Sequence, residues 1–464
     1  MRGFRTVLIC FILGIIVLGG QGCKKPLTLS QGHLEFSVDT LLFDTVFTSI
    51  GSTTLHFKIY NRENKLLKID EVQLMGGGLS PFRINLDGLS GTQFQDIEIP
   101  GGDSLFVFAE VTLDPNGSNL PLIIEDSVRF RSNGLDQYVK LAAWGQDAYF
   151  HHLDENDGVW LADKPHVVYD ASFVLEDKTL TIEAGAKVHF HKNSLLFVKR
   201  GRLIVNGEKG KEVEFLGDRL ESFYDDVAGQ WYGIYLDSCL PSQIDHALIK
   251  NGTAGIHVTG NNPANAPGEF SLTLTNSRLF NHASYGVFSY AGAKINMENT
   301  LIAKNGRHAF FSLAGGSFSI RHCDLLSYAN SNEEQIAFAV KNYFNTDGIT
   351  LAGDVDGKIY NSVIYGYQEH EFVLDTIGLE QGISLNFEVK NCVLKNESIS
   401  SGSIFEQISW NADPLFTDIT AYDFHFLTSS PLSNKGNSLY STPLDLEGNT
   451  RSVNTPDIGV YEID

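Results

Sequence analysis

Residues 34–147 show short alternations of apolar and polar side chains. In the first run, Leu34, Phe36 and Val38 are separated by single polar residues. An alternation of period two places every second side chain on one face of a β-strand, as a half-buried strand requires. Similar runs, with turn clusters rich in Gly and Pro between them, occupy residues 55–59, 105–111, 128–130 and 138–142. This pattern predicts one β-sandwich over residues 34–147.

Residues 148–464 repeat over a longer interval. The apolar pair Leu180 and Ile182 is followed 23 residues later by Leu203 and Val205, and a Gly-containing corner lies between the two pairs. A helix would place its apolar residues at i, i+3 and i+4, which these pairs do not. The spacing therefore indicates very short strands that turn a corner and return one coil later.

A polar signal marks the same interval. Asn276, Asn299 and His322 occupy equivalent positions in two successive steps of 23 residues, and Asn361 and Asn391 continue the series after longer insertions. Asn tolerates the left-handed backbone, and its amide can bond with the Asn of the next coil. Coils stacked at a strand spacing of about 4.8 Å form a solenoid. The sequence thus predicts an all-β chain in which a right-handed parallel β-helix over residues 148–464 follows the sandwich.

The beginning of the chain has the pattern of an export signal. Arg2 and Arg5 precede an apolar run over residues 7–18. A helix of that length spans roughly 18 Å, less than the ~30 Å hydrocarbon core of a membrane, so the run is typical of a signal peptide and not of a transmembrane helix. Residues 18–23 resemble a bacterial lipobox. The resemblance implies a signal peptide over residues 1–22, lipidation of Cys23 and a lipidated tether over residues 23–33.

Charge and cysteine content limit the possible partners. The net charge of −22 over 464 residues argues against nucleic-acid binding, because phosphate recognition requires basic surfaces. Beyond Cys23, the cysteines are Cys239, Cys323 and Cys392. Their number and wide spacing fit neither a disulfide framework nor a metal site. We expect them to be buried free thiols.

Residues 148–464 resemble the pectate-lyase-like family of right-handed parallel β-helices, in the form found in lipoproteins of Bacteroidota type. The resemblance rests on residues 180–190, 201–207 and 229–234 and on a closing sequence at 413–416, 430–432, 434–436, 445–451 and 457–462. It implies a structural closing segment that caps the last coil. It also implies a lipid-anchored protein of the outer membrane, on the periplasmic face or at the cell surface.

The sandwich segment also resembles known modules. Residues 34–147 are similar to the immunoglobulin-like modules that precede larger domains in bacterial surface proteins. The similarity rests on residues 57–61, 67–69, 99–105 and 131–134. Such modules act as spacers or binding platforms, and nothing in this segment indicates catalysis.

Candidate ligand-binding residues are few, and the catalytic residues stay unknown. Glycoside hydrolysis needs a pair of carboxylates, and the nearest pair is Asp225 and Asp226, in an insertion that also fits a solvated loop. Asp245 lies in an Ile-Asp-His tripeptide similar to one of pectate-lyase-like enzymes, but no Arg-rich partner strand accompanies it. Trp231 and Tyr232 could stack on a sugar, although the tryptophan belongs to a structural motif of the family.

Two functions remain open on the sequence. The first is an envelope lipoprotein whose β-helix binds a glycan or a protein partner without catalysis. The second is a polysaccharide lyase or glycoside hydrolase whose site is built on the β-helix face and its insertion loops. No metal or cofactor is expected, except Ca²⁺ under the lyase alternative, where it would neutralise a uronate carboxylate. The fold alone does not decide between the two functions.

Overall fold

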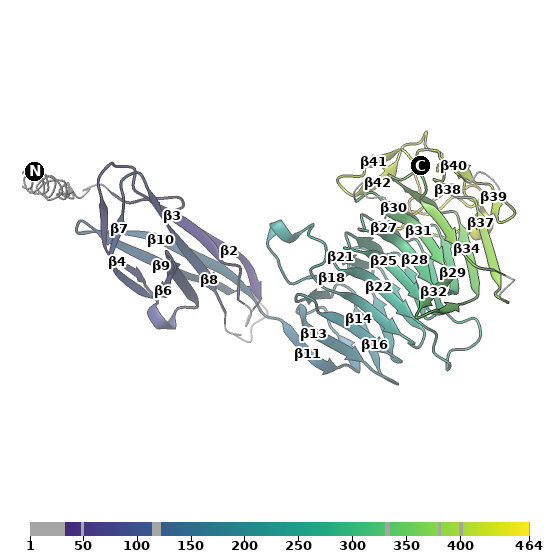
Figure 1. The fold of residues 1–464 in the computed structure, drawn as a ribbon, viewed down its shortest axis with the longest axis horizontal. Helices are drawn as coiled ribbons and strands as arrows, with labels where there is room; N and C mark the ends of the chain where they lie inside the picture. The colour runs from purple at the N-terminus through teal and green to yellow at the C-terminus, as the bar shows by residue number, and fades with distance from the viewer. Residues whose placement is uncertain are drawn as a thin grey trace, which may run out of the picture. The chain divides into compact units, whose positions relative to one another are not determined.

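The computed structural model describes residues 33–47, 51–113, 122–329, 335–378, 382–398 and 402–463. The chain divides into two compact units, and the division falls between Gln146 and Asp147. Each unit is built from β-strands, as Figure 1 shows. The predicted signal peptide, Cys23 and the tether to residue 32 lie outside the described residues.

The first unit is a β-sandwich of two five-stranded sheets. In β8, every second side chain from Leu105 to Val111 is buried, which is the predicted period-two pattern. One sheet has the order β1 (Glu35–Phe36), β3 (Leu55–Tyr60), β8 (Ser104–Val111), β5 (Phe82–Leu86), β6 (Leu89–Gly91). The other has the order β2 (Thr40–Phe47), β10 (Leu135–Gln146), β9 (Leu122–Ser132), β4 (Leu67–Leu74), β7 (Gln93–Ile99). A short 3₁₀ helix, η1 (Gly77–Leu79), follows β4.

The second unit is a parallel β-helix, and the predicted fold class is confirmed. Its strands form three faces, which the chain visits in turn on every coil. The first face, here called the polar face, is a ten-stranded parallel sheet of β12 (Gly158–Trp160), β14 (Thr179–Glu183), β17 (Arg202–Asn206), β20 (Ser242–Asp245), β23 (Leu272–Thr275), β26 (Ala293–Glu298), β29 (Gly316–Arg321), β34 (Val355–Tyr360), β37 (Leu385–Lys390), β39 (Phe405–Glu406).

The other two faces belong to one eighteen-stranded sheet, whose first strands, β11 (Tyr149–Glu155) and β13 (His166–Val174), serve both. The covered face consists of β15 (Lys187–Phe190), β18 (Val213–Gly217), β21 (Ala247–Lys250), β24 (Arg278–Phe280), β27 (Leu301–Ala303), β30 (Asp324–Ser327), β35 (Val363–Gly366), β38 (Val393–Leu394), β40 (Ser409–Trp410). The aromatic face consists of β16 (Leu195–Lys199), β19 (Gly233–Asp237), β22 (Ala254–Thr259), β25 (Tyr285–Tyr290), β28 (His308–Leu313), β31 (Ile336–Lys341), β36 (Phe372–Asp375).

Six short elements complete the described part of the second unit. A hairpin of β32 (Tyr343–Thr346) and β33 (Ile349–Ala352) interrupts the coil between β31 and β34. Near the C-terminus, β41 (Phe416–Asp418) and β42 (Asp423–Phe426) pair with each other. Two 3₁₀ helices are also present: η2 (Ser222–Tyr224) precedes β19, and η4 (Ser438–Tyr440) follows β42. The insertions of the β-helix hold η2 and the β32–β33 hairpin.

The predicted repeat is present in the strand register. Leu180 pairs with Leu203 and Ile182 pairs with Val205 in a parallel ladder between β14 and β17, and all four side chains are buried in the core. The core of the β-helix is a single apolar cluster that runs from Trp160 to Leu394. The cysteines Cys239, Cys323 and Cys392 are buried in it as free thiols, as expected.

The predicted asparagine ladder is also present. It occupies the corner between the polar face and the covered face, where the backbone is left-handed on seven of the described coils. Asn299 Nδ2 donates to Asn276 Oδ1 at 3.1 Å, and Asn276 Nδ2 donates to Asp245 Oδ1 at 2.8 Å. The positive φ values belong to His246, Asn276, Asn299, His322, Asn361, Asn391 and Gln407. Asn is favoured there because it tolerates this conformation and satisfies its amide on the next coil.

The closing segment, residues 411–463, differs from its predicted position. We expected it to cap the last coil. Instead it lies along the covered face, where its side chains form a separate apolar cluster with outward residues of β24, β27, β30, β35 and β38. Its own strands pair only with each other among the strands that the structure describes. The segment therefore shields a lateral apolar surface, because outward side chains such as Phe280, Leu301 and Val363 are apolar and need cover.

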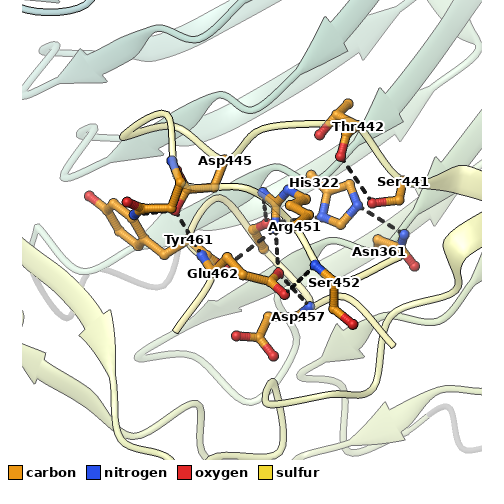
Figure 2. Close-up of polar contacts among 12 residues, drawn as sticks. His322, Asn361, Ser441, Thr442, Asp445, Arg451, Ser452, Asp457, Tyr461 and Glu462 are labelled. Atoms are coloured by element: carbon orange, nitrogen blue, oxygen red, sulfur yellow. Dashed lines mark hydrogen bonds and ion pairs between the residues drawn. The ribbon is translucent and has the colours of Figure 1, made fainter. Parts of the chain in front are cut away.

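Arg451 is the main polar anchor of the closing segment, as Figure 2 shows. Its side chain is almost fully buried, and Nη2 donates to Asn299 Oδ1 at 3.1 Å and to the Gly459 carbonyl at 2.9 Å. Nη1 lies 3.4 Å from Glu462 Oε2. His322 is held nearby through Nδ1, 3.2 Å from the same Gly459 carbonyl, and burial lowers its pKa well below the ordinary value. The closing segment is thus fastened to the asparagine ladder.

Asp324 lies beside this anchor, and its pKa is raised. Burial raises its pKa to about 8, although a hydrogen bond from the Val460 backbone and the charge of Arg451 oppose the increase. Its Oδ1 has no hydrogen-bond partner among the described residues. A Cβ at Gly459 would lie 2.4 Å from that oxygen, which explains the glycine at this position of φ +93°.

We predict that Asp324→Asn stabilises the protein at high pH. The folded form binds the Asp324 proton more tightly than the unfolded form, so its stabilising effect is complete below about pH 4 and is lost as the pH rises through about 8. The asparagine cannot ionise, so the variant should gain up to about 1.4 kcal/mol for each pH unit across that interval. Urea denaturation at pH 5 and pH 9 measures the difference. If the substitution changes the free energy of unfolding equally at both pH values, the raised pKa of Asp324 is contradicted.

Candidate functional site

The outward side chains of the three faces differ in chemistry. On the polar face, one continuous outward column contains Gln243, Thr273, Asn296, Ser319 and Lys358 in register. The covered face is apolar and is shielded by the closing segment. The aromatic face has outward rings, and it is the surface with features of a binding site.

Six rings form a continuous column on the aromatic face, here called the aromatic ladder. Neighbouring members are partners in the parallel register of successive coils. The centroids of Tyr235 and His257 are 4.3 Å apart, and those of His257 and Phe288 are 4.6 Å apart. Phe288 and Phe311 stack at 5.5 Å. In order, the ladder consists of Phe173, Phe197, Tyr235, His257, Phe288 and Phe311.

The aromatic ladder is half-buried and retains accessible ring surface. Each of the six side chains has intermediate exposure. In the described part of the chain, their ring contacts are all with side chains of β13 to β28 or with Tyr232, directly before β19. With a strand spacing of about 4.8 Å, six successive rungs extend over about 24 Å. This length suits an extended ligand that lies along the β-helix axis.

Additional rings and polar groups flank the ladder. Tyr285 lies 5.0 Å from Phe288 on one side, and Tyr290 lies 6.1 Å from it on the other. Thr259 Oγ1 donates to the Tyr235 hydroxyl at 3.2 Å. Burial lowers the pKa of His257 to about 4, so the ladder carries no charge at neutral pH. An uncharged aromatic strip with hydroxyl groups at its margin can stack on sugar rings and bond to their hydroxyls.

Asp237 and Asp375, two carboxylates on the strands of this face, are too far apart for paired catalysis. Asp237 on β19 and Asp375 on β36 occupy one outward column, separated by five rungs. At about 4.8 Å for each rung, they are about 24 Å apart. Glycoside hydrolysis places its two carboxyl groups about 5–10 Å apart. Asp375 is also paired with Lys341 at 3.1 Å. Asp237 and Asp375 therefore do not form one catalytic pair.

The predicted residues Trp231 and Tyr232 have different environments. Trp231 is fully buried, stacks on Phe190 at 4.1 Å and donates its Nε1 hydrogen to the Lys250 carbonyl at 2.9 Å. The interpretation of Trp231 as a sugar platform is therefore wrong, because the ring fills the core. Tyr232 is 38% exposed and lies 6.4 Å from Tyr235, at the margin of the aromatic ladder.

The three carboxylates predicted from the sequence do not lie at the aromatic ladder. Asp226 lies in the insertion between β18 and β19, where Lys250 Nζ pairs with it at 2.8 Å and the Tyr422 hydroxyl donates to it at 3.2 Å. The Lys250 contact lowers the Asp226 pKa. Asp225 is exposed in the same insertion. Asp245 belongs to β20 of the polar face and takes part in the asparagine ladder. Asp226 and Asp245 are therefore bonded to other residues of the fold, and Asp225 is exposed to solvent.

The aromatic ladder itself was missed in the sequence. Each ring is next in sequence to an inward apolar residue of its strand. The rings therefore recur at the same sequence interval as those inward residues. Insertions before β19 and β25 change that interval. An alignment of the inward residues coil by coil would have shown an aromatic side chain at the same outward position on six coils.

Neither a metal cluster nor a membrane-spanning helix is present in the described residues. Over these ranges, no three His, Cys, Asp or Glu side chains gather as they would around a metal ion. Within the same ranges, no helix is both long enough and apolar enough to span a bilayer.

Comparisons with known proteins give distant structural similarities. No protein-family model matches the chain, and no curated protein matches it in sequence. A complex of XylC with xylose matches 90% of this chain and 87% of that chain, with 8% identity and a TM-score of 0.34. The catalytic unit of a GH87 α-1,3-glucanase from Streptomyces thermodiastaticus matches 74% of this chain and 78% of that chain, with 12% identity and a TM-score of 0.25. A family 123 glycoside hydrolase from Clostridium perfringens matches 25% of this chain, which covers 26% of that enzyme, with 7% identity and a TM-score of 0.18.

Proposed function

We propose that the protein is a lipid-anchored envelope protein whose β-helix binds a glycan along the aromatic ladder without cleaving it. The observation that carries this proposal is the column of six half-buried rings in register from Phe173 to Phe311. A contiguous strip of uncovered aromatic side chains marks an interaction surface, whereas the apolar side chains of the covered face are shielded by the closing segment.

Sugars suit this surface better than the other partner classes. The pyranose ring has an apolar face of C–H groups that can lie on an aromatic ring, and its hydroxyls can bond at the margin. The net charge of −22 argues against polyanionic ligands such as nucleic acids. A linear glycan can follow a straight column of rings over its whole length. The weak contacts between its sugar units and the rings then add up to a measurable binding affinity.

The test is incubation of soluble protein, residues 24–464, with neutral and uronate-containing glycans. We expect saturable binding measured by calorimetry, with no new reducing ends and no absorbance of unsaturated uronate. The appearance of either product would contradict non-catalytic binding and would support the lyase or hydrolase alternative. Failure of all glycans to bind would contradict the proposal as a whole.

The lipid anchor is a separate part of the proposal. The lipobox-like sequence before Cys23 supports it, and two or three acyl chains hold a protein stably on a membrane. We expect Cys23→Ser to abolish incorporation of a labelled fatty acid and to release the protein from the membrane fraction. Cys239→Ser is the control, because that thiol is buried in the core and should not affect labelling. Labelling that persists in the Cys23 variant would disprove the anchor.

A further inference from the structure

A hollow lies on the covered face, between the closing segment and the last coils. Its volume is about 570 Å³, within the range of small-molecule sites. Outward side chains of the coils form one wall, and residues of the closing segment form the other. Its lining includes Tyr328, Tyr365, Lys395, Asp413, Phe416 and Asp418.

The aromatic part of the hollow is fixed by packing. Tyr328 contacts Phe416 at 6.3 Å, and Phe416 contacts Phe424 at 5.5 Å, both edge to face. Lys395 Nζ lies 5.2 Å from the centroid of the Tyr365 ring. Two tyrosine rings and one phenylalanine ring therefore line the hollow and are held by the apolar cluster beneath the closing segment.

The polar part offers both a donor and acceptors. Lys395 Nζ donates to the Gly366 carbonyl at 2.9 Å and approaches the Tyr367 carbonyl at 3.4 Å, which uses two of its three hydrogens. Asp413 Oδ1 accepts from the Leu415 backbone at 2.9 Å. Asp413 is exposed, which leaves its other carboxylate oxygen open to a ligand. One N–H and one carboxylate oxygen are thus available at the hollow.

The charges of the hollow select the class of ligand. Asp413 and Asp418 supply two negative charges and Lys395 supplies one positive charge. The surplus of negative charge disfavours uronates and phosphates, and Lys395 offsets one of the two negative charges. A neutral polyhydroxy ligand both donates and accepts hydrogen bonds, so it can use Lys395 and Asp413 together while one face of it lies on a tyrosine ring.

We propose that this hollow is a second binding site, which takes a neutral sugar or the end of a short neutral oligosaccharide. The site is separate from the aromatic ladder, because it lies on the covered face and is completed by the closing segment. The Asp-Pro-Leu-Phe sequence at residues 413–416, which the family resemblance explains as structural, would supply a ligand contact through Asp413 and an aromatic wall through Phe416.

The experiment measures binding of glucose, galactose, mannose, xylose and their neutral disaccharides to soluble protein, residues 24–464, by calorimetry. Lys395→Met and Asp413→Asn keep the size of each side chain, and the amide introduced by the second substitution keeps an oxygen for the Leu415 backbone. We expect each variant to bind at least 10-fold more weakly. Lys358→Met, on the polar face, is the matched control and should bind normally. Photocrosslinking with a diazirine derivative of the tightest sugar should label peptides that contain Tyr365 or Phe416.

The aromatic ladder is tested in parallel so that the two sites can be distinguished. Tyr235→Thr, Phe288→Thr and Phe311→Thr, combined in one protein, should leave binding at the hollow unchanged. Three results would overturn the second site: no binding of any sugar in the panel, unchanged affinity in both the Lys395 and the Asp413 variants, or loss of all binding in the ladder variant. None of these results depends on whether long glycans bind to the ladder.

Discussion

Arg451→Met should lower the free energy of unfolding by about 3–5 kcal/mol, as expected when one partner of a buried charged network is removed. Methionine keeps most of the side-chain volume but donates no hydrogen bonds. The Gly459 carbonyl would lose its 2.9 Å bond from the guanidinium, and Glu462 would lose its buried partner. Urea denaturation at pH 7, followed by tyrosine and tryptophan fluorescence, measures the change.

Arg200→Met is the control for this variant. Arg200 is 58% exposed and lies 3.7 Å from an equally exposed Glu176, so its loss should change stability by no more than about 0.5 kcal/mol. Limited proteolysis gives a second readout, because the Arg451 variant should be cut within residues 411–463 before the coils are cut. Equal stability of the two variants would show that the closing segment is not fastened through Arg451.

The second large effect concerns the aromatic ladder. Tyr235→Thr, Phe288→Thr and Phe311→Thr, combined, should weaken binding of a long neutral glycan by roughly 10- to 1,000-fold, since each ring contact contributes about 0.5–1.5 kcal/mol. Threonine favours strands, so the coils should persist. Calorimetry measures the affinity, and circular dichroism checks that the fold is retained.

The polar face provides a matched control. Gln243→Thr, Ser319→Thr and Lys358→Thr, combined, change three outward side chains of one column of the polar face. This protein should bind the glycan with the affinity of the original chain. If both combined variants bind equally well, the aromatic ladder is not the glycan site.

The parts of the fold that depend on local sequence could be predicted. The register of Leu180 with Leu203 follows from apolar pairs one coil apart, and the left-handed backbone at Asn276 and Asn299 follows from the preference of Asn for this conformation. Both signals depend on residues within one coil of each other.

The position of the closing segment could not be predicted in the same way. Its place depends on contacts such as that of Arg451 with Asn299, which join residues far apart in the sequence. An apolar sequence at the end of the chain fits a cap on the last coil as well as a cover on a lateral face. The choice depends on the outward side chains of β24 to β38, whose common face becomes visible only when the coils are stacked.

The candidate site was predicted only at its margin. Tyr232 was identified and lies beside Tyr235, whereas Trp231 was chosen for its ring and is in the core. A sequence shows that a residue is aromatic, but its inward or outward direction depends on one step of strand register. Two insertions shift that register along the ladder, so the common column was not apparent.

The most direct test of the account is a crystal structure of the soluble protein with the glycan that binds most tightly. The account predicts glycan density over the rings between Phe173 and Phe311, with an intact linkage between the sugars. Density of a cleaved product, or a long glycan bound only on the polar face, would contradict it.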